Sequence, residues 1–320
     1  MFKSSDVSVV IPAHNCESFI IDAIQSVEKQ TCPPREIIVV ENASSDKTFQ
    51  IVSSYAQSSS VVIRIVRTDC PGVSNARNTG FSIARTDLIA MLDADDEYRS
   101  DFIEVAVQAF NAQEDLSLFF GNRSLFIDGE YFDEGFLEST ELKNLGAKEI
   151  GSSINVVEGD LFSSLLQGNF VSCSAAVVRK ERAYQADLFP VGVVSSEDRK
   201  FFCRLDLTGK AAFTWEICHY YRIHGDSKTK SSDSEQLAKN GVYTLRLLAL
   251  ECERNNISDF QRSELKNALS KEAFRLLTII SEKGSLDFFS KRYGFERMCV
   301  NKRKVVRLGV KSFLYWLLKI

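Results

Sequence analysis

Several features are missing from this sequence, and each absence excludes a class of protein. The 320 residues carry a net charge of −4, whereas a general nucleic-acid binder is usually basic, so we expect no nucleic-acid partner. No run approaches the roughly 18 apolar residues of a membrane-spanning helix. The start of the chain has no charged segment followed by an apolar run and a cleavage site, so we expect no secretory signal and a cytoplasmic protein.

The cysteines also lack a pattern. Eight are present, but no two form a Cys-x-x-Cys pair. A chain this long does not need disulfides to fold, so we expect free thiols in a reducing compartment. Internal repeats and low-complexity tracts are likewise missing.

Apolar runs and helical patterns alternate through about the first 95 residues. Short apolar runs predict strands at 7–11, 37–40, 61–66 and 88–92, and helical spacing predicts helices at 17–30, 49–55 and 74–84. We expect Pro12 to stop the first strand. This alternation predicts an α/β fold with a doubly wound, mostly parallel, Rossmann-like sheet flanked by helices.

The pattern changes further along the chain. We predict helices at 101–112 and 160–167 and from residue 197, and strands at 116–127, 171–178 and 212–221. The stretch 131–158 has weak periodicity and reads as a loop-rich insertion. From about residue 234 the spacing is entirely helical. We therefore expect one domain over 1–230, with a nucleotide-binding half at 1–100 and an acceptor half at 101–230, and a C-terminal helical extension over 231–320.

A cluster of acids follows the predicted strand at 88–92: Asp93, Asp95, Asp96 and Glu97. Enclosed carboxylates repel one another, and a bound cation would compensate their charge. A polar loop that opens a helix is the plain alternative. In open parallel sheets, ligands bind beyond the carboxyl ends of the strands. The loops at 12–15, 41–42 and 93–95 therefore converge on one crevice, which favours a site.

Six segments resemble family 2 glycosyltransferases of the GT-A fold. They are 7–15 (VSVVIPAHN), 37–46 (IIVVENASSD), 72–78 (GVSNARN), 92–96 (LDADD), and the pair 197–198 (ED) with 221–224 (YRIH). The resemblance covers roughly residues 6–230. It implies an inverting transfer of a sugar from a nucleotide-sugar, with a UDP-sugar as the first guess, to an acceptor hydroxyl.

The resemblance also implies roles for particular residues on the donor side. Asp95 would bind Mn²⁺ or Mg²⁺, which stabilises the leaving diphosphate, and His224 would complete the metal shell or touch the diphosphate. Asp93 would contact the ribose or share the metal through water, whereas Asp96 is expected to be a loop acid. The remaining nucleotide-sugar contacts would come from Pro12, His14, Asn15, Glu41, Asn42, Arg77, Ala94 and Arg222.

Some of these assignments have alternatives. Glu41 stands where the family usually has Asp and would contact the nucleotide base. Arg77 would pair either with a phosphate or with the acid cluster. Arg222 or Lys228 would neutralise phosphate charge. His219 alternates with apolar neighbours and is expected to be structural.

On the acceptor side, the family position of the catalytic base is Asp198, beside Glu197. Two acids at a helix start can instead complement the helix dipole. The acceptor would be a saccharide or a lipid-linked saccharide in surface polysaccharide synthesis.

The C-terminal segment 301–320 is basic, then aromatic and aliphatic, and has no acid. It fits either a closing helix or an interfacial helix on an anionic membrane, with Tyr315 and Trp316 at the headgroups.

Two rival functions belong to other classes. One is a non-catalytic nucleotide-sugar-binding or scaffold protein of the same fold. The intact Asp93, Asp95 and Asp198 speak against it. The other is a nucleotidyltransferase, which would need a Gly-rich basic loop after the first strand, and residues 12–15 (PAHN) do not form one.

Overall fold

The computed structural model describes residues 1–151, 153–193, 195–225, 234–252 and 257–282. The chain forms two compact units, Met1–Gly225 and Asp226–Ile320. Each unit is described by itself below.

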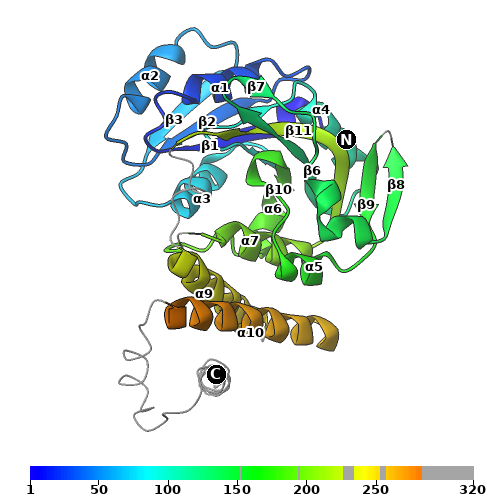
Figure 1. Ribbon diagram of the computed structural model, residues 1–320. Coiled ribbons are helices and arrows are strands. Elements are labelled where there is room, and N and C mark those ends of the chain that lie inside the picture. Colours follow the sequence, from blue (N-terminus) through cyan, green and yellow to red (C-terminus); the bar gives the residue numbers. More distant parts are fainter. Residues whose placement is uncertain (152, 194, 226–233, 253–256, 283–320) are drawn as a thin grey trace. The chain divides into compact units, whose positions relative to one another are not determined.

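The first unit is built on one mixed sheet (Figure 1). The central strands run in the order β3 (Val62–Arg67), β2 (Glu36–Glu41), β1 (Val7–Ala13), β4 (Leu88–Met91), β10 (Ala176–Arg179), β6 (Leu116–Ile127), β11 (Lys210–Ile223), β9 (Ile154–Val157) and β8 (Ala147–Gly151). Two short strands lie off this path, β5 (Glu97–Tyr98) against β11 and β7 (Glu130–Tyr131) against β6.

Most of the long strands point the same way. β3, β2, β1 and β4 are parallel to one another, and β6 is parallel to β11. The intervening β10 is antiparallel to both β4 and β6, so all six long strands end at one edge of the sheet. The predicted fold class is therefore confirmed, with β10 as the reversed strand that joins the two parallel groups.

Helices cover both faces of the sheet, which explains the apolar runs of the central strands. The helices of the first unit are α1 (Ile20–Glu28), α2 (Thr48–Tyr55), α3 (Val73–Ile83), α4 (Phe102–Ala112), α5 (Leu161–Gln167), α6 (Lys180–Gln185) and α7 (Glu197–Asp206). Val7, Val9 and Ile11 belong to the core under α1, α2 and α4. Val10 points the other way, against Gly80 of α3, where a Cβ would overlap its side chain.

Pro12 does not stop the first strand, contrary to expectation. β1 continues to Ala13, and Pro12 is in register with Val40 of β2. The pairing of β1 with β4 ends at Val10, whose carbonyl accepts from Leu92 N–H. In a parallel strand the nitrogen of Pro12 points to the same side as Val10, past the end of β4. Its missing N–H therefore costs no ladder hydrogen bond.

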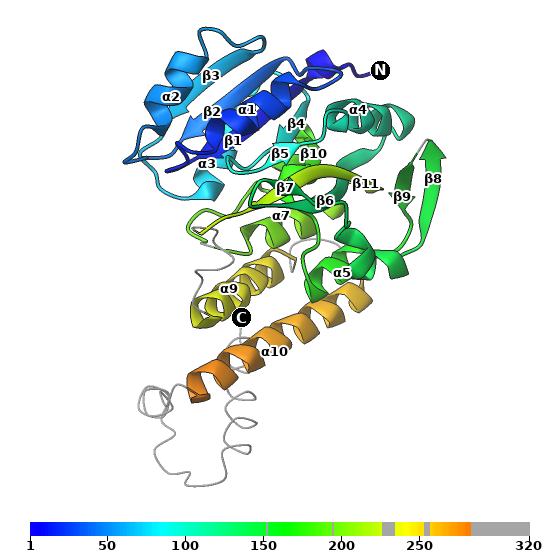
Figure 2. The same cartoon turned by 45° about the horizontal axis from the view of Figure 1, so that its top comes forward.

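The stretch 131–158 is more regular than predicted. It contains the paired strands β8 and β9, and β9 pairs with β11. Figure 2 shows both strands at the end of the sheet away from β3. Four of the five β8 residues are exposed. A strand that buries neither face has no alternation of apolar and polar residues, and sequence periodicity therefore does not reveal it.

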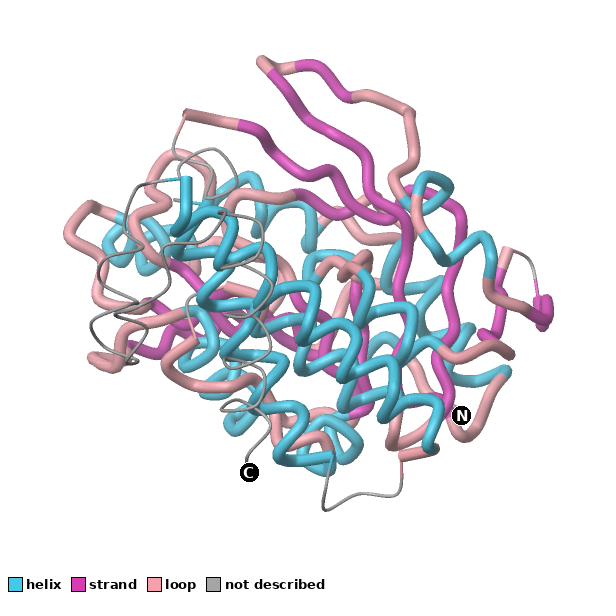
Figure 3. The backbone as a smooth tube through the Cα atoms, turned by 60° about the horizontal axis from the view of Figure 1, so that its bottom comes forward, coloured by secondary structure: helices cyan, strands magenta, loops and turns pink. Residues whose placement is uncertain are grey.

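The second unit is helical over its described residues. α9 (Ser234–Cys252) and α10 (Asp259–Glu282) pack side by side (Figure 3). Val242, Leu245 and Leu248 of α9 and Leu265 and Leu269 of α10 are buried. Among the described residues, no helix has the length and apolarity needed to cross a membrane. The seven described cysteines form no disulfide with one another.

Candidate active site

The loops after β1 and β2 are held together by hydrogen bonds at the carboxyl edge of the sheet. Asn42 N–H donates to Ala13 O at 2.8 Å, and His14 Nδ1 lies 2.7 Å from Asn42 O. Asn15, with a φ of +49°, accepts from Ser45 N–H through Oδ1 at 2.8 Å. His14, Asn15 and Asn42 therefore belong to one hydrogen-bonded wall, at the edge of the sheet where these loops were predicted to converge.

Asn42 also fixes the loop before α3. Its amide donates to Cys70 O at 2.6 Å and accepts from Gly72 N–H at 2.8 Å. Gly72 has a φ of +112°, a conformation that side chains with a Cβ rarely adopt. Asn42 is only 5% exposed, so its amide positions backbone here.

Glu41, the predicted contact to the nucleotide base, is buried. The residue is 1% exposed, and its carboxylate accepts from Ser44 N–H at 2.5 Å and Arg67 Nε at 2.9 Å. Although burial opposes ionisation, these hydrogen bonds lower the pKa of Glu41 below its usual value. A contact with the base would require one of these partners to be exchanged, and that role stays a prediction.

Arg77 connects the acid cluster to the predicted base region. Its guanidinium donates to Asp93 Oδ1 at 2.7 Å and to Glu197 Oε1 at 3.1 Å, and the Arg77 side chain is 5% exposed. Of the two partners considered for Arg77, the structure shows the acid cluster. Burial disfavours the charged guanidinium, but the surrounding negative charge, including Asp93 and Glu197, keeps the pKa of Arg77 raised.

Asp95 and His224 come together from opposite parts of the chain. His224 Nε2 lies 3.1 Å from Asp95 Oδ2, and the imidazole packs on Phe19 with 4.6 Å between ring centroids. The Asp95 side chain is 36% exposed and the His224 side chain 19%. These two predicted metal ligands are thus neighbours that remain accessible. Ala94 between the acids is 7% exposed.

Arg222 faces acids rather than open space. Its guanidinium donates to Glu97 Oε1 at 2.5 Å, to Asp22 Oδ2 at 3.0 Å and to Asp95 O at 3.0 Å. It also lies 4.4 Å from the ring centroid of Phe126. Neutralising a phosphate would require a change of partner, so this role stays a prediction. Lys228, its alternative, lies outside the described residues.

Asp96, which we expected to be only a loop acid, is buried. It is 1% exposed, accepts from Arg222 N–H at 3.1 Å, and has Oδ2 3.8 Å from His219 Nε2. Burial, with the charges of Asp95 and Asp93, raises the pKa of Asp96 well above its usual value. Burial lowers the pKa of His219 to about 3, which makes it a neutral core residue near neutral pH.

Asp198 lies in the first turn of α7. Its Oδ2 accepts from Asn169 Nδ2 at 2.8 Å, and its Oδ1 accepts from Arg199 N–H at 2.7 Å. Burial raises the pKa of Asp198, and these bonds together with the charge of Arg77 oppose the rise. A raised pKa suits a general base that operates near neutral pH.

Two residues that were not among the predicted site residues also contact the site. Asn169 bonds Asp198, and Ser174 Oγ accepts from Asp93 N–H at 3.1 Å. Nothing local distinguishes them, because Asn169 follows Gly168 in an ordinary turn signature and Ser174 lies in an apolar stretch. Only their positions in space reveal them.

Comparison with known proteins agrees with this geometry. The sequence model described as "Glycosyl transferase family 2" matches residues 8–152. The chain contains a family 2 glycosyltransferase domain. The match includes the loops after β1, β2 and β4.

Two curated relatives show how far the likeness extends. The glycosyltransferase is 25% identical over 237 residues to "UDP-Glc:alpha-D-GlcNAc-diphosphoundecaprenol beta-1,3-glucosyltransferase WfaP" of Escherichia coli, which covers 74% of this chain and 84% of WfaP. It is 22% identical over 263 residues to the chondroitin synthase of Pasteurella multocida, covering 82% of this chain but only 25% of that protein.

A solved structure supports the fold. Residues 1–349 of S. aureus TarS in complex with UDP-GlcNAc superpose with a TM-score of 0.65 at 17% identity, covering 98% of this chain and 81% of the TarS chain. At this identity the likeness establishes a shared GT-A fold.

Proposed function

We propose that this glycosyltransferase moves a sugar from a UDP-sugar to a hydroxyl of a saccharide or lipid-linked saccharide acceptor, with inversion and with a divalent metal. The observation that carries the proposal is Arg77, which bonds Asp93 in the β4 loop and Glu197 beside Asp198. One buried cation thereby ties a donor half to an acceptor half. The names of the relatives support the substrates, since WfaP is named for UDP-Glc and a diphosphoundecaprenol acceptor and TarS was solved with UDP-GlcNAc.

The donor half offers ligands that fit a metal shared with a diphosphate. The described residues contain no group of three or more His, Cys, Asp or Glu that could hold a metal by itself. Asp95 Oδ2 and His224 Nε2 supply two ligands, and Mg²⁺-type sites commonly use one or two carboxylates and take the rest from substrate phosphates and water. A metal held there would stabilise the charge that develops on the leaving diphosphate. Oxygen with imidazole suits Mn²⁺ better than Mg²⁺.

In the acceptor half, Asp198 would act as the general base. Its carboxylate takes the proton of the acceptor hydroxyl while that oxygen forms a bond to the anomeric carbon. The bond from the anomeric carbon to the diphosphate oxygen breaks on the opposite face, and the electron pair leaves with UDP. Attack opposite the leaving group inverts the configuration. Asn169, 2.8 Å from Asp198 Oδ2, would hold the carboxylate in place.

The alternative is a protein of the same fold that binds nucleotide-sugars without transferring them. The retention of Asp93, Asp95 and Asp198 favours catalysis, because a binding protein has no use for a base. The names of the relatives, a glucosyltransferase acting on a diphosphoundecaprenol-linked sugar and a chondroitin synthase, support a role in polysaccharide synthesis.

A thermal-shift screen of nucleotide-sugars with Mn²⁺ tests the donor. Binding of a ligand to the folded state raises Tm in proportion to RT ln(1 + [L]/Kd), so a UDP-sugar should give the largest shift. Asp198→Asn should then abolish transfer while keeping the same shift. A loss of UDP affinity in Asp198→Asn would count against the base, and a wild type that binds donor without transferring to any acceptor supports the binding-protein alternative.

A further inference from the structure

Arg123 on β6 lies at the same edge of the sheet as the acid cluster. Ala176 of β10 pairs with Met91 of β4 on one side and with Phe120 of β6 on the other. Arg123 therefore stands three residues beyond the level at which β4 gives way to the Asp93 loop. Across the ladder it is in register with His219 of β11.

The surroundings of Arg123 connect it to the base. Asn169 bonds Asp198, and three residues later Ser172 Oγ lies 3.2 Å from His219 Nε2. The segment 169–172 thus runs from the base to the histidine that faces Arg123. The Arg123 guanidinium lies over Phe136, 4.0 Å from the ring centroid, and 5.2 Å from that of Tyr221. Phe136 belongs to the long insertion after β7.

The guanidinium of Arg123 makes no hydrogen bond or ion pair with any residue that the structure describes, and its Nε is buried without a partner. Arg77, Arg182 and Arg222, by contrast, each donate to at least one carboxylate. Packing against two aromatic rings orients a guanidinium, and its N–H groups can then donate to a ligand that binds beside it.

The charge on Arg123 is poorly compensated by its neighbours. The residue is half-buried, and burial lowers the pKa of its guanidinium. His219, its neighbour across the ladder, is neutral because burial lowers its pKa, and no carboxylate among the described residues forms an ion pair with Arg123. A desolvated cation without a partner costs stability. Such a group is expected where a ligand supplies the missing charge.

We propose that Arg123 binds an anionic group of the acceptor, either a phosphate of a lipid-linked saccharide or the carboxylate of an acidic sugar. This inference rests on the proposed function. Both groups present two coplanar oxygens that match the guanidinium fork. We favour the acceptor over the donor as the ligand of Arg123. Arg123 lies on β6 near segment 169–172, which contacts Asp198, whereas the loops after β1 and β2 are the ones expected to bind the nucleotide.

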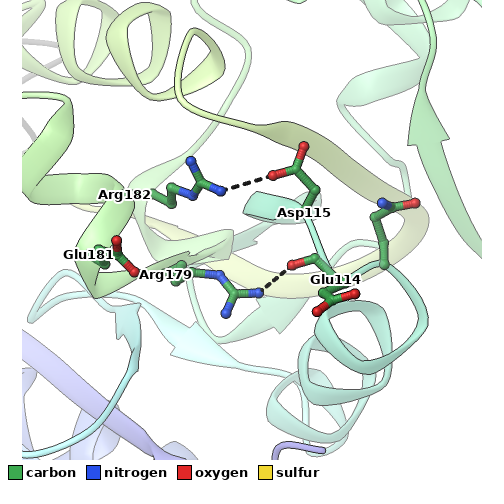
Figure 4. A pocket seen from close by; sticks show the side chains of 6 residues that line it. Glu114, Asp115, Arg179, Glu181 and Arg182 are labelled. Carbon is green, nitrogen blue, oxygen red and sulfur yellow. Dashed lines mark hydrogen bonds and ion pairs between the residues drawn. The ribbon is translucent and has the colours of Figure 1, made fainter.

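A second hollow is also lined by arginines, but these arginines have protein partners, so it provides a control. A hollow of about 540 Å³ at the amino end of β6 is lined by Gln113, Glu114, Asp115, Arg179, Glu181 and Arg182. Figure 4 shows Arg182 directed at Asp115, 2.9 Å away, and Arg179 directed at Glu114, whose carbonyl accepts at 2.8 Å. Both arginines are satisfied by the protein, so Arg182→Gln removes an arginine without touching the site.

The test uses three probes with the same alkyl chain: hexyl diphosphate, hexyl glucuronide and neutral hexyl glucoside. Binding is measured by calorimetry on the full chain saturated with UDP and Mn²⁺, which keeps the probes out of the donor site. The wild type should bind one anionic probe about tenfold to a hundredfold more tightly than the glucoside, the range for one charge-assisted hydrogen bond. Whichever anion is preferred names the source of the charge.

Arg123→Gln should abolish this preference, Arg123→Lys should keep part of it, and Arg182→Gln should keep all of it. The affinity for UDP should not change in Arg123→Gln, and its Tm should stay within about 4 °C of the wild type, since an unpartnered arginine is lost. The inference is overturned if the wild type shows no preference, if the preference survives in Arg123→Gln, or if that variant binds UDP more weakly. A wild type that binds no UDP at all instead refutes the proposed function.

Discussion

Arg77 Nη2 lies 2.7 Å from Asp93 Oδ1, and the same guanidinium reaches Glu197 with its other terminal nitrogen. The two carboxylates are 104 positions apart in the chain (197 − 93) and come from a strand end and a helix start. A buried cation between two acids is costly to remove, because it leaves uncompensated charge behind. The geometry of the donor loop and of the base therefore depends on one side chain.

Replacing Arg77 should move the pH profile of the enzyme. The charge of Arg77 lowers the pKa of Asp198, against the larger effect of burial. In Arg77→Met that pKa should rise further, so the acid limb of kcat/KM moves to higher pH. Arg77→Lys keeps the charge and should leave the limb closer to the wild type. An unmoved limb in Arg77→Met would show that Asp198 is not the group that titrates.

Arg77→Met should also unfold more easily, by about 3 kcal/mol, the usual loss when one partner of a buried pair is removed. Urea unfolding measures this loss in the free energy of unfolding. The pH profile must be taken at a temperature where the variant is folded.

Removing Asn169 should weaken catalysis without weakening donor binding. Its amide donates to Asp198 Oδ2 at 2.8 Å and to Val171 O at 3.1 Å. In Asn169→Ala the ionised base loses a hydrogen bond, so kcat should fall by about tenfold to a hundredfold. Kd for UDP should stay constant, and the acid limb should again move to higher pH. A variant that loses UDP affinity as well would mean that Asn169 only shapes the fold.

Patterns along the chain predicted the parts of this protein that depend on local periodicity. The buried strands at 7–13 and 88–91 are almost entirely apolar because helices cover both faces of the sheet. The loops at the carboxyl edge followed from the topology. β8 was missed because an exposed edge strand needs no apolar side chains.

The sequence alone could not predict which residues contact each other in the folded chain. Arg77 had two possible partners, and only the fold brings Glu197 to it. Asp96 and Asp95 are adjacent acids of the same type, yet one is 1% exposed and the other faces His224. Strand register and the path of the loop decide which of the two acids is buried, and the type of residue predicts neither the register nor the path.

Metal dependence should rest on Asp95 more than on His224. Asp95→Ala removes the carboxylate that faces the imidazole, and UDP binding should then no longer respond to Mn²⁺. His224→Gln keeps a polar side chain and should lose only part of the response. Calorimetry measures the affinity for UDP in the presence of Mn²⁺ and in the presence of EDTA. Asp101→Asn serves as the control, because Asp101 is an acid paired with Arg99 outside the site. Equal UDP affinity of the wild type in both buffers would exclude the metal.

Asp206 should make the protein less stable as the pH rises. Burial raises its pKa to about 7, against about 3.9 in the unfolded chain. The folded state therefore binds the extra proton, and stability is full below about pH 4 and is lost as the pH rises through about 7. Asp206→Asn keeps an acceptor for Phe162 N–H, which now donates to Asp206 Oδ2 at 3.0 Å.

The Asp206→Asn variant should gain about 2 kcal/mol at pH 8, half of the full linkage value of about 4 kcal/mol, and little at pH 4. Urea unfolding at both pH values measures this. An equal change at the two pH values would mean that Asp206 does not titrate in this range.

The segment 301–320, which lies outside the described residues, should attach the protein to anionic membranes. It has six basic residues and no acid, and five of the six precede Tyr315, Trp316 and their aliphatic neighbours. Each Lys or Arg near an anionic surface contributes about 1 kcal/mol, and the aromatic rings settle at the headgroups. An enzyme held there would meet a lipid-linked acceptor at the membrane surface.

Sedimentation with vesicles tests this attachment. The full chain should bind vesicles that contain phosphatidylglycerol and not those of phosphatidylcholine alone, and binding should fall as salt is added. Deleting the residues after Asn301 should release the protein while Kd for UDP is unchanged. Replacing Lys302, Arg303 and Lys304 with Gln should weaken binding through charge alone, and Trp316→Ala through insertion alone. A full chain that stays in the supernatant with anionic vesicles leaves the closing helix as the role of this segment.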